Sequence, residues 1–235
     1  MPRSARIIPE EGVFHLLTRG NNRQAVFHDA SDFETYLLIL SRIQRLHPFR
    51  LYHYCLMTNH VHLLIETVPG HPLSRLMKKL NLTYALYYKK KYSHIGHFWQ
   101  DRFKSLLIEK DLYLLACAAY IELNPVKAGM VKDPAEHPYS SFSFYASGIT
   151  SPFLTPDPLY ETFGDTEEVR RKNYREFVLA RLEDYELFER QAFAKHALGS
   201  EDFLRSLQVQ FNVFISRRPR GRPRHEKPKE EIVQK

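Results

Sequence analysis

Two strand-like runs, residues 49–58 (FRLYHYCLMT) and residues 59–67 (NHVHLLIET), follow each other directly in the sequence. Runs of this kind separated by a tight turn, here at Thr58–Asn59, predict a β-hairpin. A hairpin implies a larger sheet, because an isolated pair of strands is only marginally stable in water. The rest of the sequence must therefore supply partner strands and the helices that cover them.

The second run of this hairpin contains two histidines one residue apart, His60 and His62. Side chains two residues apart on a strand face the same side, so the two imidazoles project in parallel, while Val61 and Leu63 point to the opposite face. We expect Val61 and Leu63 to face a core under the helices. The histidines are then expected on the open face of the sheet.

Local patterns outside the hairpin predict further strands and helices. Residues 12–20 and 96–109 are strand-like, and the capping-box pattern of Ser31 and Glu34 predicts a helix that begins at Ser31 and ends near residue 46. Pro72 opens a long amphipathic helix, and Asp111 caps a helix that ends at Asn124–Pro125. This order of elements predicts an α+β fold, in which a central antiparallel or mixed sheet carries helices packed on one face.

The composition changes after Ser147, which suggests a division of the chain. We expect a folded domain over residues 1–147 and a proline-containing linker over residues 148–164. A helical C-terminal region is expected over residues 165–215, followed by a basic, flexible tail over residues 216–235. The tail holds eight Lys or Arg and three Glu, so it carries +5 of the net charge of +7. Nucleic acid is the partner that such a tail favours, although a solubilising end is an alternative.

Composition excludes several classes of protein. Hydrophobic residues make up 43% of the chain, which is enough for a packed core. There is no run of eighteen apolar residues and no secretory signal at the N-terminus, so neither a membrane span nor export is expected. The two cysteines, Cys55 and Cys117, fit a reduced cytoplasmic protein better than a disulfide scaffold.

The parallel histidines are candidate ligands of one divalent ion, because neutral imidazole nitrogens bind metals readily. The alternative to a metal site is that His60 and His62 are simply two polar residues on a solvated face of the sheet. A third ligand could come from Asn124, which lies four residues after Tyr120 and therefore on the same helix face. An amide oxygen suits Mg²⁺ or Mn²⁺, and a phenol beside a metal-bound phosphate can act as a nucleophile. Tyr120 could instead be a structural tyrosine of the core. Tyr113 lies on the same helix face, so the face alone does not single out Tyr120 as the nucleophile.

These pieces together resemble a known family. The motifs RGNNRQ, MTNHVHLLIE, FWQDRFKS and YIELNPVKAGMV, in this order over roughly residues 5–145, are similar to those of REP-associated tyrosine transposases. These proteins are single-tyrosine HUH transposases related to insertion-sequence transposases. Both histidines and the tyrosine match the family pattern, and Asn124 stands where some relatives have glutamine.

The resemblance implies a metal-dependent endonuclease and strand transferase that acts on single-stranded DNA at repetitive, REP-like hairpins. His60, His62 and Asn124 would hold one Mg²⁺ or Mn²⁺, and Tyr120 would attack the scissile phosphate to give a 5′-phosphotyrosyl link and a free 3′-OH. The family fold is an α+β sandwich with a central antiparallel sheet. REP-associated members resemble self-contained monomers, and we expect a monomer here.

Basic and amide side chains are candidate DNA contacts. Arginine can read guanine edges or hold phosphates, and by resemblance the N-terminal segment would recognise a short guide sequence beside the hairpin. The tail segment around Gly221 resembles an AT-hook, although plain phosphate attraction is the simpler interpretation. The candidate DNA-binding residues are Arg3, Arg6, Arg19, Asn21, Asn22, Arg23, Arg102, Lys104, Arg220 and Arg222.

Two other functions remain compatible with these residues. The chain could be a DNA-hairpin-binding protein that has lost turnover. It could also be a phosphodiesterase that uses water, for which Glu66 is the nearest carboxylate on the histidine face, although it lies four and six residues along the strand. The sequence does not specify the hairpin, the role of the C-terminal helices, or whether the gene is mobile.

Overall fold

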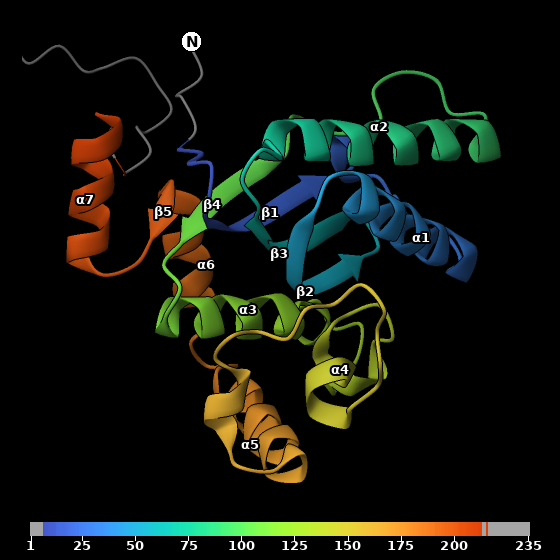
Figure 1. The fold of residues 1–235 in the computed structure, drawn as a ribbon. Helices are drawn as coiled ribbons and strands as arrows, with labels where there is room; N and C mark the ends of the chain where they lie inside the picture. The colour runs from blue at the N-terminus through green and yellow to red at the C-terminus, as the bar shows by residue number, and fades with distance from the viewer. Residues whose placement is uncertain (1–6, 213–214, 216–235) are drawn as a thin grey trace, which may run out of the picture.

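The computed structural model describes residues 7–212 and residue 215, and its centre is a five-stranded sheet. The strands lie in the order β2-β3-β1-β4-β5, as Figure 1 shows. Neighbouring strands are antiparallel except for the short β5, which runs parallel to β4. The strand bounds are β1 Val13–Arg19, β2 Phe49–Met57, β3 His60–Thr67, β4 Lys104–Ile108 and β5 Ala197–Leu198. The predicted hairpin of residues 49–67 is therefore present as β2 and β3.

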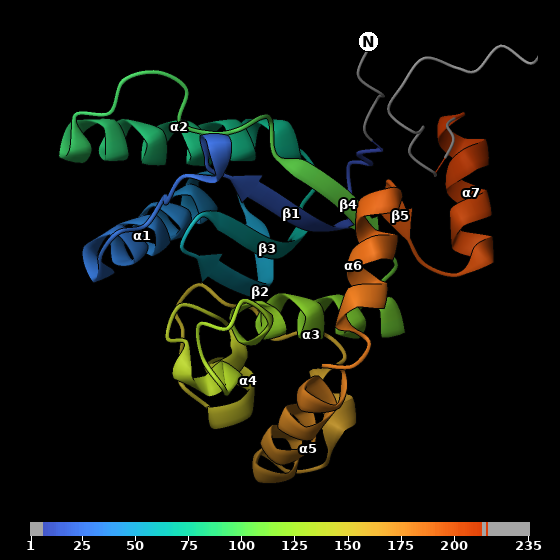
Figure 2. The ribbon, with the colours of Figure 1, turned by 180° about the vertical axis from the view of Figure 1, so that it is seen from behind.

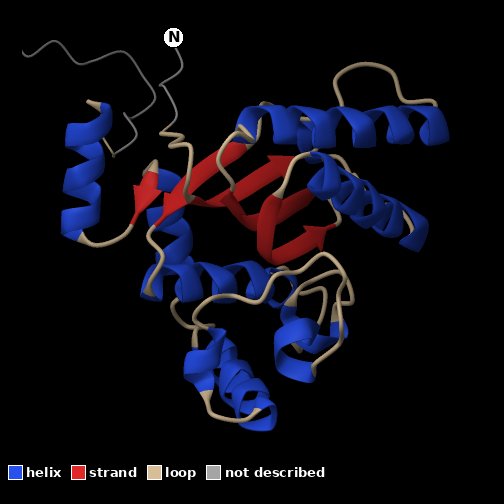
Figure 3. Ribbon diagram, viewed as in Figure 1, coloured by secondary structure: helices blue, strands red, loops and turns tan. Residues whose placement is uncertain are grey.

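Helices cover both faces of this sheet. Helices α1 and α2 lie on one side and α3 on the other (Figures 1 and 3). The helix bounds are α1 Ala30–Leu46, α2 Leu73–Tyr92, α3 Leu112–Lys127, α4 Phe142–Ser147, α5 Glu167–Ala180, α6 Tyr185–Ala194 and α7 Glu201–Phe211. Short 3-10 turns are η1 Asn21–Arg23, η2 Pro134–Glu136 and η3 Tyr160–Phe163. The α+β class with a largely antiparallel central sheet and a helical C-terminal region is thus confirmed.

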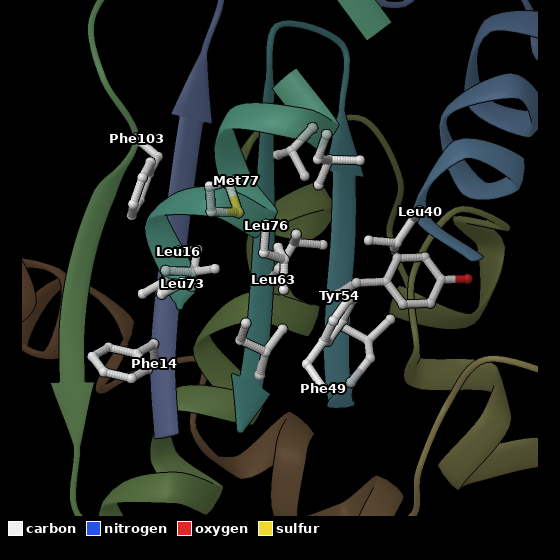
Figure 4. Packing of buried hydrophobic residues seen from close by; sticks show 14 of the residues in the cluster. Phe14, Leu16, Leu40, Phe49, Tyr54, Leu63, Leu73, Leu76, Met77 and Phe103 are labelled. Atoms are coloured by element: carbon white, nitrogen blue, oxygen red, sulfur yellow. The ribbon is translucent and has the colours of Figure 1, made fainter. Parts of the chain in front are cut away.

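The expectation that the helices lie on one face and leave the histidine face open is wrong. Val61 and Leu63 do face the core under α1 and α2, where they pack with Leu76 and other apolar side chains (Figure 4). The histidine face packs against α3, which buries Leu64 of β3 in a second core. The cause is the composition of α3, whose apolar residues surround the helix on most sides, so that it needs a sheet to cover it.

Two local expectations also differ from the structure. Helix α1 begins at Ala30 with Asp29 as its N-cap, because the Asp29 carboxylate accepts a hydrogen bond from the Asp32 amide and Ser31 donates to that carboxylate. The strand expected over residues 96–109 is confined to β4, because Phe98 is buried among the aromatic side chains of α2.

Parts of the C-terminal half of the chain reach the sheet layer, while α5 packs against α3 and α4. The segment expected as a linker runs beside β2, where Leu154 forms a bridge with Leu51 and the Thr155 amide donates to the Leu51 carbonyl. Seen from behind, α6 lies beside β4 and β5 and near one end of α3 (Figure 2). Among the residues described, no helix combines the length and apolarity that a membrane crossing requires.

Candidate functional site

A pocket of about 250 Å³ opens where the ends of β1 and the β2–β3 hairpin meet helices α3 and α6. It contains all four residues that the sequence nominated for metal binding and nucleophilic attack. The side chains that form it are Arg19, Met57, His60, His62, Tyr120, Asn124, Lys127, Tyr185 and Glu189, together with Ala128. The convergence of these segments, which lie far apart in the sequence, makes this pocket the candidate active site.

The histidine pair and the tyrosine are in contact across the pocket. The ring centroids of His60 and His62 are 4.9 Å apart, and those of His62 and Tyr120 are 5.7 Å apart. The β1–β3 register places Arg19 directly opposite His60, so the guanidinium lies on the same face of the sheet as the imidazoles. The Nε atom of Arg19 is buried without a hydrogen-bond partner.

Hydrogen bonds at the far side of each imidazole set its orientation. Nδ1 of His60 lies 2.6 Å from Oδ1 of Asn59, so Nδ1 carries the proton and Nε2 keeps its lone pair. Nδ1 of His62 lies 2.8 Å from Nε2 of His15 in a buried contact. Nε2 of His62 is buried and has no hydrogen-bond partner, which is costly for a polar atom in a protein interior.

The site holds its imidazoles in the neutral state. Burial and the Arg19 guanidinium lower the pKa of His60 to about 4, against a smaller opposing effect of the hydrogen bond with Asn124. Burial and the neighbouring His60 lower the pKa of His62 well below its usual range, and they lower the pKa of His15 to about 3. Neutral imidazoles are the form that binds a metal ion, so no proton has to be displaced at neutral pH.

A proline in α3 orients the carboxamide of Asn124. The predicted end of this helix at residue 124 is wrong, since α3 continues through Pro125 to Lys127. Pro125 has no N–H, so the carbonyl of Ile121 lacks its usual helical donor. Nδ2 of Asn124 donates to the carbonyls of Tyr120 at 2.7 Å and Ile121 at 3.3 Å, which satisfies the free carbonyl. The amide oxygen is thereby left on the pocket side, where it can serve as a ligand.

The opposite side of α3 is fixed by a buried charge network. Glu122, between Tyr120 and Asn124 in the sequence, accepts hydrogen bonds from Ser141 Oγ at 2.6 Å and from the Tyr174 hydroxyl at 2.8 Å. Its carboxylate also lies 3.0 Å from Nδ1 of His53, whose Nε2 lies 3.1 Å from Asp157.

His53 is the charged partner of both carboxylates in this network. Burial alone would lower the pKa of His53, but the hydrogen bonds to Asp157 and Glu122 outweigh it and raise the pKa to about 9. A protonated His53 therefore connects β2, α3 and the segment before α5. Because Glu122 is held in this way, the rotation of α3 that presents Tyr120 and Asn124 to the histidines is held as well.

Helix α6 covers the candidate nucleophile. The rings of Tyr185 and Phe188 pack against Tyr120 with centroid separations of 4.7 and 4.9 Å. The hydroxyl of Tyr185 donates to Oδ1 of Asn124 at 2.9 Å. Burial, followed by the nearby Tyr185 and Glu189, raises the pKa of Tyr120 well above its ordinary value. The phenol is thus neutral in this arrangement.

The donor set fits a divalent ion. Nε2 of His62 is an orphaned buried nitrogen, Nε2 of His60 has an available lone pair, and Oδ1 of Asn124 is an amide oxygen on the same pocket. In the described part of the chain, no three His, Cys, Asp or Glu side chains are grouped as a metal cage. Two imidazoles and one amide leave open positions for phosphate oxygens and water, as Mg²⁺ and Mn²⁺ require.

The candidate DNA-binding residues are dispersed. Arg19 lines the pocket, and Asn21, Asn22 and Arg23 form η1, whose Arg23 carbonyl accepts a hydrogen bond from Asn59. Lys104 is the exposed first residue of β4.

The remaining candidates lie off the sheet or outside the described residues. Arg102 lies in the bend before β4 rather than on a strand, although residues 96–109 were expected to be one. Arg3, Arg6, Arg220 and Arg222 lie outside the described residues.

Several residues in the pocket or directly behind it were not identified from the sequence. Lys127 lies three residues after Asn124, and helical spacing alone could have placed it on the same face. His15 is two strand positions from a residue opposite His62, and finding it requires the β1–β3 register. Tyr185 and Glu189 come from α6, and no local signal indicates that this helix returns to the site.

The structure brings the residues of the sequence motifs together. A central antiparallel sheet with a His-x-His strand faces a helix that carries a tyrosine and an amide one turn apart. Residues 10–124 match the family model described as "Transposase IS200 like", and they form a domain of that family.

One solved structure shares this fold, and a second is similar over a smaller part of the chain. A structure described as a REP-associated tyrosine transposase bound to a REP hairpin is 19% identical in sequence, with a TM-score of 0.55 over 67% of this chain and 93% of that one. A putative transposase from Deinococcus radiodurans R1 is 18% identical and gives a TM-score of 0.37 over 55% of this chain and 92% of that one. No curated protein matches the chain significantly.

Proposed function

We propose that this transposase is a metal-dependent endonuclease and strand transferase that cuts single-stranded DNA at REP-like hairpins. The observation that carries the proposal is the meeting of His60, His62, Tyr120 and Asn124 in one pocket, with an unpartnered imidazole nitrogen among them. The structural likeness to a hairpin-bound transposase supports a DNA hairpin as the partner. We place this activity in the cytoplasm.

Three neutral ligands would hold one Mg²⁺ or Mn²⁺, namely Nε2 of His60, Nε2 of His62 and Oδ1 of Asn124. When bound, the ion would polarise the scissile phosphate and offset the negative charge that develops on it. Arg19 and Lys127 also lie on the pocket and bring two positive charges to the same place. Phosphate binding is therefore favoured by the protein itself as well as by the ion.

Tyr120 is the nucleophile of the proposed reaction. Its hydroxyl oxygen forms a bond to phosphorus while the bond from phosphorus to the 3′ oxygen breaks, and the proton lost by the phenol balances the one gained by the leaving 3′-OH. The products are a 5′-phosphotyrosyl link and a free 3′ end. Attack by another 3′-OH reverses the step and joins strands without ATP, because the phosphotyrosine retains the energy of the phosphodiester.

All of these side chains come from a single chain. A monomer therefore has the complete set, and we propose that the protein acts as a monomer.

Trapping of a covalent adduct tests the proposal. A single-stranded hairpin oligonucleotide labelled at its 3′ end is incubated with Mn²⁺ and the full chain, and products are separated under denaturing conditions. We expect the label to migrate with wild-type protein and Tyr120→Phe to form no adduct while it binds the hairpin normally. Tyr113→Phe, seven residues earlier on the same helix, is the matched control and should form the adduct. An adduct with Tyr120→Phe, or an adduct with a 5′-labelled strand instead, would refute the assignment.

A water-using phosphodiesterase is the second candidate, and one observation favours it. Glu66 is excluded as its base, since it is held by Tyr52, Arg50 and Lys110 and does not line the pocket. Glu189, however, is a carboxylate of the pocket. Cleavage of the hairpin without any trapped adduct would support this alternative, and hairpin binding without cleavage would indicate a binding protein.

A further inference from the structure

His15 is a buried histidine of β1 that lies behind the candidate metal site. Its Nε2 is 2.8 Å from Nδ1 of His62, and the two rings are stacked at 5.1 Å with an interplanar angle of 10°. His15 pairs with Leu64 across the β1–β3 ladder, so it is the diagonal neighbour of His62 on the same face.

His15 is not itself placed to bind an ion in the pocket. It is absent from the pocket wall, and its Nε2 faces the side of His62 that points away from the pocket. His62 thus has one nitrogen in contact with a buried hydrogen-bond partner and the other, Nε2, buried on the pocket wall without one. At His60, Asn59 likewise occupies Nδ1.

We propose that His15 is a positioning residue, which accepts the Nδ1–H of His62 and so keeps the lone pair of Nε2 directed at the metal. A neutral imidazole carries one proton, and a proton on Nε2 would block that nitrogen as a ligand. With His15 as acceptor, the Nδ1–H form is the one that satisfies a buried donor. The stacked rings also hold the plane of His62. This inference rests on the proposed metal site.

Metal binding by the full chain, measured calorimetrically with Mn²⁺ alone, tests the proposal without any DNA reaction. His15→Phe keeps a ring of similar shape and removes the acceptor, so Mn²⁺ affinity should fall by about 10- to 100-fold. His15→Gln restores a polar group near the position of Nε2 and should recover most of that loss. His137→Phe, which removes a buried histidine that bonds the Leu56 carbonyl away from the pocket, is the control and should bind Mn²⁺ like wild type.

A spectroscopic readout keeps the test decisive if His15→Phe does not fold. Long-range ¹H–¹⁵N correlations of the metal-free wild-type protein report which ring nitrogen of His62 carries the proton. We expect Nδ1–H in wild type and in His15→Gln, which keeps an acceptor, and a shift toward Nε2–H in His15→Phe where that variant folds. Nε2–H in wild type would overturn the proposal.

The wild-type protein and His62→Ala separate this inference from the proposed function. If wild type binds no Mn²⁺, or if His62→Ala binds it equally well, the metal site itself is wrong and the inference falls with it. If wild type binds Mn²⁺ through His62 but His15→Phe binds with the same affinity, only the role of His15 is refuted.

Discussion

The hydroxyl of Tyr185 donates a hydrogen bond of 2.9 Å to Oδ1 of Asn124, the oxygen that we assign as a metal ligand. Tyr185 belongs to α6, and its ring also packs against Tyr120. A lone pair engaged by the phenol is less available to an ion. Helix α6 therefore competes with the metal for one atom of the site.

Removal of this hydroxyl should strengthen metal binding. We expect Tyr185→Phe to raise the Mn²⁺ affinity of the full chain several-fold, because Oδ1 of Asn124 then has no competing donor from α6. The lost hydrogen bond should lower the free energy of unfolding by about 1 kcal/mol. Phe188→Leu, which alters packing on Tyr120 without touching Asn124, serves as the comparison. Weaker Mn²⁺ binding by Tyr185→Phe would show that the hydroxyl supports the site rather than competing for it.

Lys127 should contribute to cleavage without contributing to folding. Its side chain is exposed and lines the pocket beside Asn124. We expect Lys127→Gln to lower the single-turnover cleavage rate by roughly 10- to 100-fold, through loss of a positive charge beside the phosphate. Lys127→Arg should retain most of the rate, and Lys132→Gln, an exposed lysine outside the pocket, should cleave like wild type. An unchanged rate for Lys127→Gln would remove Lys127 from the mechanism.

The buried network around His53 predicts how stability depends on pH. The pKa of His53 is raised to about 9 in the folded protein, by Asp157 and Glu122 against the opposing effect of burial. Since the folded-state pKa exceeds the unfolded one near 6.5, the stabilisation is complete below about pH 6.5 and is lost as pH rises through 9. The loss is on the order of 3 kcal/mol.

Denaturant unfolding at a series of pH values measures this effect. We expect the free energy of unfolding to decline between pH 6.5 and 9 in wild type. His53→Gln should be less stable at neutral pH, because two buried carboxylates lose their counter-charge, and its profile should be flatter over the same range. A pKa for His53 near its ordinary value, measured by NMR on wild type, would refute the prediction independently of the variant.

We expect replacement of Pro125 to affect metal binding at the site more than the stability of α3. In Pro125→Ala the new N–H can bond the Ile121 carbonyl, so the carboxamide of Asn124 loses part of what orients it. We expect a several-fold loss of Mn²⁺ affinity with little loss of stability, since alanine favours a helix more than proline does. Pro134→Ala, at the first residue of η2, should leave Mn²⁺ affinity unchanged. Wild-type affinity in Pro125→Ala would show that the Tyr120 carbonyl alone orients the amide.

Much of the site could be predicted from local periodicity. The parallel projection of His60 and His62 follows from the two-residue repeat of a strand, and the shared face of Tyr120 and Asn124 follows from the helical repeat. Neither repeat predicts which face of the sheet α3 will cover. That depends on long-range packing, and for this reason the histidine face was expected to be open although α3 covers it.

In strand β2 the side chains do not alternate strictly between the two faces of the sheet. Its register with β3 shifts between Leu51 and His53, so that Tyr52 and His53 both reach the α3 side of the sheet. A strict two-residue alternation would have sent one of them to the other core. A bulge of this kind depends on the pairing of two strands, and no single segment of sequence specifies it.

The covering of both sheet faces limits how a nucleic acid can approach the metal ligands. His62 and Met57 are buried, and of the two imidazoles only that of His60 is partly exposed, as is Arg19 beside it. A phosphodiester must therefore protrude from its strand to reach them. Paired DNA is too stiff to bend so sharply over a few nucleotides, so we expect the mouth of the pocket to select unpaired segments by their flexibility.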